Sequence, residues 1–320
     1  MNGWLLRRTA AGLVRLAPAR SLAFAALCVM AFGACVVLAP EPTSAVSLRR
    51  LTVNGAEHTY VEQGTGDAVV FLHGSATDYR VFDELRRHFG RDFRFVAYSR
   101  RHHAPNAWPD DGDTYRMTQH AEDLVALIRA LGIERAHVVA VSMGARVAAH
   151  AAVHHADVVK TLTLSDGLLA SPGSDEGKRV LADVGPAFNA IFAHLRAGDD
   201  AAAVAAYVEM AKPDGGWNAL SSAWQSYYRD NARTLGLAAR DPTLRPPSCD
   251  ALRAIRVPVL VIAGDQTAPA FKVTNDELLR CLAPGAEYAL VPRSAHYWYV
   301  DNPGDAARLL HAFLRKHRSR

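Results

Sequence analysis

One serine of this chain lies where a nucleophile would be exposed, between an apolar run and a segment with the composition of a helix. Ser142 follows the mostly apolar run 136–141, and an alanine-rich stretch, 145–152, comes soon after it. A serine at a sharp strand-to-helix turn has a strained backbone that exposes its hydroxyl, and the helix N-terminus places positive potential beside it. The crowded backbone needs small residues two positions to either side, where Ala140 and Gly144 stand. The pattern therefore predicts a nucleophilic serine, and its alternative is a serine that only caps the helix.

Serine is a weak nucleophile until a base takes its proton, and a histidine near the C-terminus is the candidate for that base. His296 follows an apolar run, and Asp166 and Asp265 each come just past another such run. A carboxylate is needed to orient the histidine, and either aspartate could supply it. Side chains that follow parallel strands lie at the same edge of a sheet, so we expect these groups to converge on one cleft.

The order of these residues resembles that of the α/β-hydrolase superfamily. A buried run ends in a His-Gly pair at 73–74, the serine turn follows, and a carboxylate and His296 come after it. The resemblance covers about residues 51–314 and implies a mostly parallel sheet flanked by helices, with an inserted helical cap. It also implies acyl transfer through an acyl-serine, with the backbone N–H groups of Ser75 and Met143 forming the oxyanion hole. It implies no metal and no organic cofactor.

The acid is where the chain departs from the common pattern of this superfamily. Many members carry an aspartate three residues after the glycine that ends the seventh strand. That glycine is Gly264 here, the third position is Thr267, and Asp265 lies only one residue on. Some members, including certain haloalkane dehalogenases, take the acid from the sixth strand, which neighbours the nucleophile strand. We therefore favour Asp166, which follows that strand, over Asp265, and both remain candidates.

Apolar, β-branched runs recur after residue 50, and helical patterns lie between most of them. The runs are 51–60, 68–72, 93–98, 137–141, 161–164, 257–263 and 287–291. Between 118 and 131, apolar side chains recur at the spacing of one helix face. Alternating strands and helices predict an α/β fold with a largely parallel sheet covered on both faces.

No strand-like run appears between residues 168 and 249, where alanine-rich helical patterns dominate. We expect three parts: a signal peptide or membrane anchor at 1–45, a hydrolase core at 46–167 and 250–320, and a helical cap at 168–249. Trp217 and Trp224 lie in the predicted cap. Aromatic side chains there could line a substrate pocket or only pack against the core, and we take them as candidate substrate-binding residues.

Composition and charge exclude some classes of protein. Half of the 320 residues are apolar and the net charge is +4, with no basic stripe of the kind that binds nucleic acid. His150 and His154 share a helix face, but Ala151 stands where a zinc protease would carry glutamate, so we expect no metal site. Cys249 and Cys281 could pair after export or remain free buried thiols.

The N-terminal segment predicts export. Arg7, Arg8, Arg15 and Arg20 precede an uncharged run at 21–40, which is long enough to cross a bilayer core. Positive charge before an apolar run places the remainder of the chain outside the cytoplasm. The segment is either a signal peptide cut after residues 43–45 or a hydrophobic membrane-anchoring helix, and a lipoprotein-type site at Cys35 is a third, less favoured alternative.

These residues together favour a serine hydrolase that cleaves small esters or lactones, with an ester-like small molecule as its partner. The Ser-Met-Gly turn also resembles the turns of enol-lactonases, carbon–carbon-bond hydrolases and cofactor-free perhydrolases. The alternative from another class is a ligand-binding protein that keeps the fold without catalysis, and the departure at the acid position favours it.

Overall fold

The structure, a computed structural model, describes residues 47–89, 92–171, 173–211 and 215–318. The predicted signal peptide or membrane anchor at 1–45 lies outside these residues. Within the described ranges, no helix combines the length and the apolar character needed to cross a membrane. The unit described below is the one that begins at residue 45.

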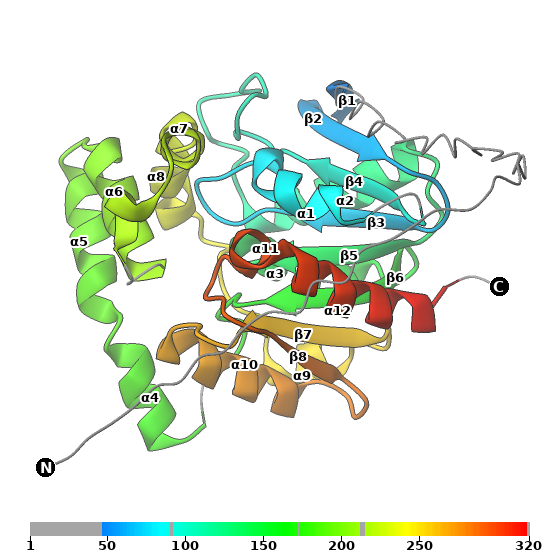
Figure 1. The fold of residues 1–320 in the computed structure, drawn as a ribbon. Coiled ribbons are helices and arrows are strands. Elements are labelled where there is room, and N and C mark those ends of the chain that lie inside the picture. The colour runs from blue at the N-terminus through cyan, green and yellow to red at the C-terminus, as the bar shows by residue number, and fades with distance from the viewer. Residues whose placement is uncertain (1–46, 90–91, 172, 212–214, 319–320) are drawn as a thin grey trace, which may run out of the picture. The chain divides into compact units, whose positions relative to one another are not determined.

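The described strands form one eight-stranded sheet in the order β1-β2-β4-β3-β5-β6-β7-β8 (Figure 1). Their bounds are β1 Arg49–Val53, β2 Ala56–Gln63, β3 Ala68–Leu72, β4 Arg94–Tyr98, β5 Ala136–Val141, β6 Val159–Ser165, β7 Val259–Gly264 and β8 Glu287–Val291. Strands β3 to β8 pair in parallel, and β2 pairs antiparallel with both β1 and β4. The sheet confirms the predicted α/β-hydrolase fold.

The apolar run at 51–60 forms a hairpin and not a single strand. The chain reverses at Asn54-Gly55, where both residues have positive φ values, 47° and 72°. An Asn-Gly pair accepts that backbone, and the twist of such a turn matches that of two antiparallel strands. The turn signal lies inside the apolar run, and the run holds parts of the first two strands of the sheet.

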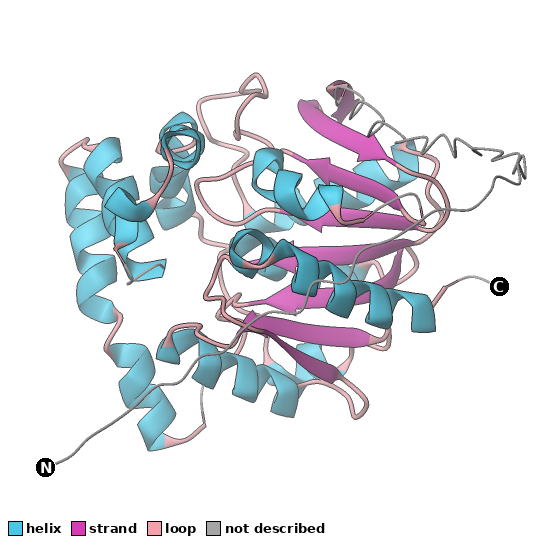
Figure 2. Ribbon diagram, viewed as in Figure 1, coloured by secondary structure: helices cyan, strands magenta, loops and turns pink. Residues whose placement is uncertain are grey.

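Helices cover both faces of the sheet (Figure 2). One apolar cluster contains side chains of α2 (Met117–Ala130), α3 (Met143–His154), α9 (Cys249–Arg253) and α10 (Pro269–Cys281). The other contains side chains of η1 (Tyr79–Phe82), α1 (Asp83–Arg87), α11 (Trp298–Asp301) and α12 (Pro303–Lys316). Successive residues of β3 alternate between them: Val70 and Leu72 belong to the first cluster, and Val69 and Phe71 to the second. A strand buried on both faces requires this continuous apolar sequence.

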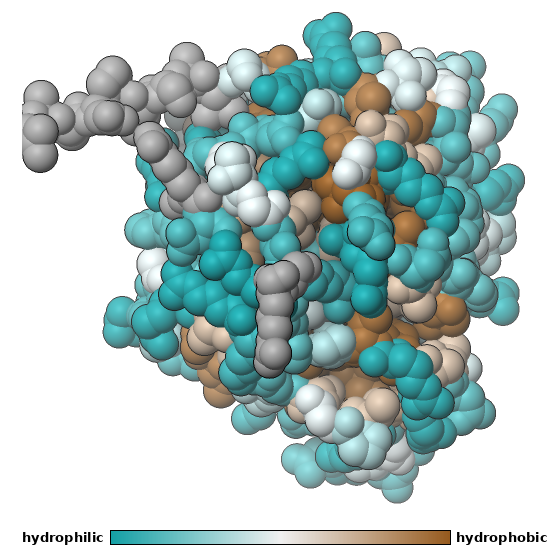
Figure 3. Space-filling view, turned by 90° about the vertical axis from the view of Figure 1, so that its right-hand side faces the viewer, coloured by the Kyte–Doolittle hydropathy of each residue, from teal (hydrophilic) through white to brown (hydrophobic). Residues whose placement is uncertain are grey.

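Between β6 and β7 the described residues form helices and no strand. These are α4 Asp175–Ala182, α5 Gly185–Arg196, α6 Asp200–Ala211, η2 Gly216–Ala219, α7 Ser222–Asp230, α8 Arg233–Arg240 and the α9 helix given above. Hydrogen bonds join this segment to loops that follow strands: Asn231 Nδ2 donates to Asp78 after β3, and the Tyr228 and Tyr297 hydroxyls pair after β8. The segment therefore contacts the domain where β3 and β8 end. The side of the domain to the right in Figure 1 is mostly hydrophilic, with hydrophobic residues in separate patches (Figure 3).

Candidate active site

Ser142 occupies a strained turn between β5 and α3. Its backbone angles, φ 52° and ψ −123°, are unusual for a non-glycine residue, and its side chain does not cap the helix. Gly144 is required two residues later, because a Cβ there would lie 2.6 Å from the His73 carbonyl oxygen. Ala140 is fully buried, so its methyl group is accommodated in the core. Ser142 is partly exposed, and its hydroxyl is not used to cap the helix.

His296 is paired with Asp166. Its Nδ1 lies 3.0 Å from Asp166 Oδ2, and both side chains are buried. A carboxylate only accepts hydrogen bonds, so Nδ1 carries the hydrogen and Nε2 presents a lone pair. This is the tautomer that a general base for a serine hydroxyl requires.

Two further donors hold the Asp166 carboxylate. Thr267 Oγ1 donates to Oδ2 over 2.9 Å, and Asn275 Nδ2 donates to Oδ1 over 2.7 Å. Asp166 itself has a positive φ of 47°, a strained conformation that directs it out of the end of β6. Thr267, the residue that replaces the usual aspartate after β7, thus donates to the carboxylate that follows β6.

Asp265 is not brought to the histidine. It is exposed, and its Oδ1 accepts a hydrogen bond from the Ser294 backbone N–H over 3.1 Å. That bond stabilises the loop between β8 and His296. Of the two candidate acids, only Asp166 contacts His296 in the structure.

Packing fixes the orientation of the histidine ring. Phe271 of α10 stacks on it, with ring centroids 4.5 Å apart and an interplanar angle of 14°. The indole N–H of Trp298 donates to Ser165 Oγ over 2.7 Å, which ties the chain just after His296 to the end of β6. Phe271, Asn275 and Trp298 were not singled out from the sequence, because helix and loop residues of these types carry no motif.

The β5–β6 pairing brings Ser142 beside Asp166. Val141 is the register partner of Ser165, and the Ser142 backbone N–H donates to the Ser165 carbonyl over 2.7 Å. No hydrogen bond joins the Ser142 hydroxyl to His296, both of which lie in the described part of the chain. Catalytic hydrogen bonds of this kind commonly tighten only when substrate is bound.

Two backbone N–H groups near Ser142 are free to bind an oxyanion. Those of Ser75 and Met143 donate to no acceptor among the described residues. The loop that carries Ser75 lies against the serine, since a Cβ on Gly74 would be 3.0 Å from Ser142 Cβ. His73 is fully buried, and burial together with the nearby Arg100 charge holds its pKa well below 6.5, so it stays neutral. His73 therefore supports the loop and does not act as a base.

The two candidate tryptophans have different surroundings. The Trp224 ring lies 6.0 Å from the ring of Tyr297, the residue after His296. Both line a groove of about 470 Å³ together with Tyr227. Trp217 instead lies under the guanidinium of Arg229, 5.2 Å from the ring centroid. Trp224 thus contacts the residue that follows His296, and both tryptophans pack against the ring of Tyr228.

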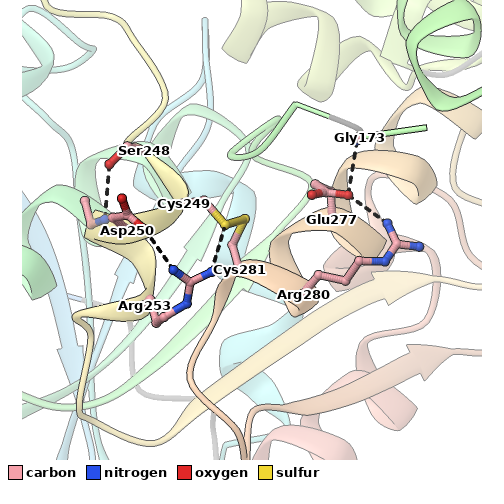
Figure 4. Close-up of a disulfide and its surroundings, with 9 residues drawn as sticks. Gly173, Ser248, Cys249, Asp250, Arg253, Glu277, Arg280 and Cys281 are labelled. Atoms are coloured by element: carbon pink, nitrogen blue, oxygen red, sulfur yellow. Dashed lines mark hydrogen bonds and ion pairs between the residues drawn. A yellow bond between two sulfur atoms is a disulfide. The ribbon is translucent and has the colours of Figure 1, made fainter. Parts of the chain in front are cut away.

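A disulfide braces the helix that supports the histidine. Cys249 at the start of α9 and Cys281 at the end of α10 are joined, with Cα atoms 4.9 Å apart (Figure 4). Helix α10 also carries Phe271 and Asn275, which contact His296 and Asp166. Within the described ranges, no group of three histidine, cysteine or acidic side chains is arranged to hold a metal ion.

Comparison with known proteins identifies the family. The family model described as "Alpha/beta hydrolase family" matches residues 69–309, about three quarters of the chain. The chain belongs to this family. The matched region includes the serine turn, Asp166 and His296.

Several members of the alpha/beta hydrolase family resemble the whole domain. The 2-(acetamidomethylene)succinate hydrolase of Mesorhizobium japonicum is 27% identical over 263 residues, which cover 79% of this chain and 87% of that protein. The crystal structure of a bacterial membrane phospholipase A superposes with a TM-score of 0.67 at 22% identity, over 86% of this chain and 87% of the other. The enol-lactonase of Burkholderia xenovorans gives a TM-score of 0.65 at 20% identity, over 83% of this chain and 100% of the other.

Proposed function

We propose that this chain is a serine hydrolase that cleaves small esters or lactones through an acyl-serine intermediate. The observation that carries the proposal is the 3.0 Å hydrogen bond between Asp166 and His296 beside the strained turn of Ser142. It supplies the carboxylate that the sequence pattern lacked at position 267, and that lack was the main argument for a binding protein without catalysis.

The proposed reaction has two halves, formation of the acyl-serine and its hydrolysis, and His296 acts as the base in both. His296 Nε2 takes the proton of Ser142 as Oγ attacks the substrate carbonyl, and Asp166 stabilises the imidazolium that forms. The Ser75 and Met143 N–H groups bind the oxyanion. His296 then protonates the leaving group and the acyl-serine remains. In the second half His296 takes a proton from water as the water attacks the acyl-serine, and it returns that proton to Ser142 Oγ as the acid product leaves.

The substrate class is proposed from the groove and the relatives. The groove that contains Tyr297, the residue after His296, also holds the aromatic side chains of Trp224 and Tyr227, which suit an apolar acyl or alcohol group. The relatives named above include hydrolases of a lactone and of an acylated enamine, both small carbonyl compounds. Carbon–carbon-bond hydrolysis and perhydrolysis use the same serine turn, so they are the chemical variants to be tested beside ester hydrolysis.

The test is turnover of p-nitrophenyl esters of increasing acyl length. We expect wild-type hydrolysis with a maximum at short acyl chains, and Ser142→Ala should lose nearly all of it while melting at an unchanged temperature. A folded wild-type protein that hydrolyses none of these esters and does not react with a fluorophosphonate would favour the binding-protein alternative. Activity of Ser142→Ala close to that of wild type would remove the serine from the mechanism.

We further propose that the domain works outside the cytoplasm, exported or tethered through residues 1–45. The Cys249–Cys281 disulfide supports this, because such bonds persist in oxidising compartments. Cell fractionation with a C-terminal tag should recover the protein from the periplasmic, extracellular or membrane fraction. Recovery from the cytosol alone would refute the proposal.

A further inference from the structure

The peptide group between Gly74 and Ser75 receives an unusual number of donors on one oxygen. The Gly74 carbonyl accepts from Arg100 Nη2 over 2.8 Å, from His73 Nδ1 over 2.9 Å and from Thr77 Oγ1 over 3.3 Å. The His73 contact is a donated hydrogen bond, because the Arg100 backbone N–H donates to His73 Nε2 and so leaves the hydrogen on Nδ1. Arg100 thus holds this loop both directly and through His73.

The Arg100 guanidinium is buried without a counter-charge. It is 1% exposed, and no carboxylate in the described part of the chain forms an ion pair with it. Its neighbours supply no negative charge: burial lowers the pKa values of His103 and His120 and raises that of Tyr115, so all three are neutral. Nε and Nη1 have no hydrogen-bond partner among the described residues.

The adjacent Arg101 shows the ordinary arrangement. It is 2% exposed, and its guanidinium forms two hydrogen bonds with the carboxylate of Asp123 and one with Thr114. An unpaired buried charge lowers the stability of a fold, whereas a paired one is compensated. The two arginines are equally buried, but only Arg101 is paired with a carboxylate. This difference indicates that the Arg100 charge serves the loop it contacts.

We propose that Arg100 positions and polarises the Gly74–Ser75 peptide, so that the Ser75 N–H is aimed at the oxyanion of the reaction proposed above. The C=O and N–H of a trans peptide point in opposite directions, so fixing the Gly74 oxygen fixes the Ser75 N–H. A charged donor on the carbonyl strengthens the N–H on the other side, because hydrogen bonds in a chain polarise one another. Arg100 is a positioning residue in this account and does not touch the substrate.

The inference is tested with Arg100→Met, which removes the charge, and Arg100→Lys, which keeps it. The matched control is Arg101→Met, whose side chain does not contact the loop. For each protein, the active sites are titrated with a fluorophosphonate, and kcat per site and KM are measured with a p-nitrophenyl ester. Inhibition by an aryl boronic acid is also measured, because its tetrahedral adduct on serine carries the negative charge that the oxyanion hole binds. Melting temperature reports stability separately.

Arg100→Met should lower kcat per titrated site by about 10- to 100-fold, less than loss of a complete oxyanion donor, with KM changed less than threefold. Its affinity for the boronic acid should fall in parallel, and Arg100→Lys should recover part of both losses. Arg101→Met should lower the melting temperature and leave kcat per titrated site within threefold.

Three results would overturn the inference. One is an Arg100→Met protein with wild-type kcat per site and boronic acid affinity. Another is an equal loss of kcat per site in Arg101→Met. If Arg100→Met does not fold, Arg100→Lys is compared with Arg100→Gln, which lacks the charge. Losses of kcat per site and of boronic acid affinity in Arg100→Lys that are no smaller than those in Arg100→Gln would refute the role of charge. A wild-type protein that neither hydrolyses esters nor reacts with the fluorophosphonate would instead refute the proposed function, and this inference with it.

Discussion

Replacing Asp166 by asparagine separates the charge of the proposed acid from its position. The carboxylate accepts from His296 and Thr267 at Oδ2 and from Asn275 at Oδ1. An asparagine fits these partners if its amide nitrogen replaces Oδ1 and the Asn275 side chain turns to present its own oxygen. The side-chain oxygen of the asparagine at position 166 still accepts from His296 Nδ1. The tautomer of the histidine is therefore preserved and only the charge is lost.

The size of the effect follows from the distance of the pair. With charge centres about 4 Å apart and an effective dielectric constant of about 20, a carboxylate stabilises an imidazolium by about 4 kcal/mol. One factor of ten in rate corresponds to about 1.4 kcal/mol, so kcat of Asp166→Asn should fall by about three orders of magnitude. KM should change little, because Asp166 does not contact the substrate in the proposed mechanism.

The assay is steady-state hydrolysis of a p-nitrophenyl ester, with active sites counted by fluorophosphonate titration. Asp265→Asn is the matched control, because an asparagine oxygen still accepts from the Ser294 N–H and the exposed side chain does not contact His296. It should keep kcat within threefold of wild type. A decrease of less than tenfold for Asp166→Asn, or a larger decrease for Asp265→Asn, would refute the assignment of the acid.

The remaining predictions concern stability and domain organisation. Burial lowers the pKa of His137 to about 4, so below pH 6.5 the unfolded chain binds a proton that the folded chain does not. The free energy of unfolding should therefore fall between about pH 6.5 and 4, by about 3 kcal/mol from this residue, and a melting temperature constant over that range would contradict the argument. The disulfide closes a loop between residues 32 positions apart, so Cys249→Ser should destabilise the fold by about 3–4 kcal/mol, and identical denaturant midpoints would show that the bond contributes nothing. A protein that begins at residue 45 should be soluble and as active as the full chain, and loss of either property would mean that the N-terminal segment is part of the fold.

The sheet could be predicted from the sequence because strands buried on both faces leave a continuous apolar pattern. Strands β3 to β8 correspond to expected runs, and α2 begins and ends one residue before the expected helix. The turn of the β1–β2 hairpin lies within one apolar run, which its Asn-Gly pair interrupts only briefly. The boundaries of the helical segment rest on the absence of strand-like runs.

The site was only partly accessible from the sequence. Ser142 and His296 follow from local pattern and order, since Ser142 comes directly after β5 and His296 lies in the loop after β8. The choice between Asp166 and Asp265 depended on which loop reaches His296. The positive φ of Asp166 and the hydrogen bond from Asn275 of α10 place its carboxylate there, and neither can be read from the sequence. Arg100 carried no signal at all, because neither its burial nor its missing counter-charge can be seen without the fold.

Covalent labelling tests the central claim most directly. The purified protein is treated with a fluorophosphonate, and the modified residue is located by peptide mass spectrometry in wild type and in Ser142→Ala. The account predicts one adduct per molecule on Ser142, formed faster than in Asp166→Asn, and no adduct in Ser142→Ala. A folded wild-type protein that takes up no label, or takes it up equally in Ser142→Ala, would contradict the claim that Ser142 is an activated nucleophile.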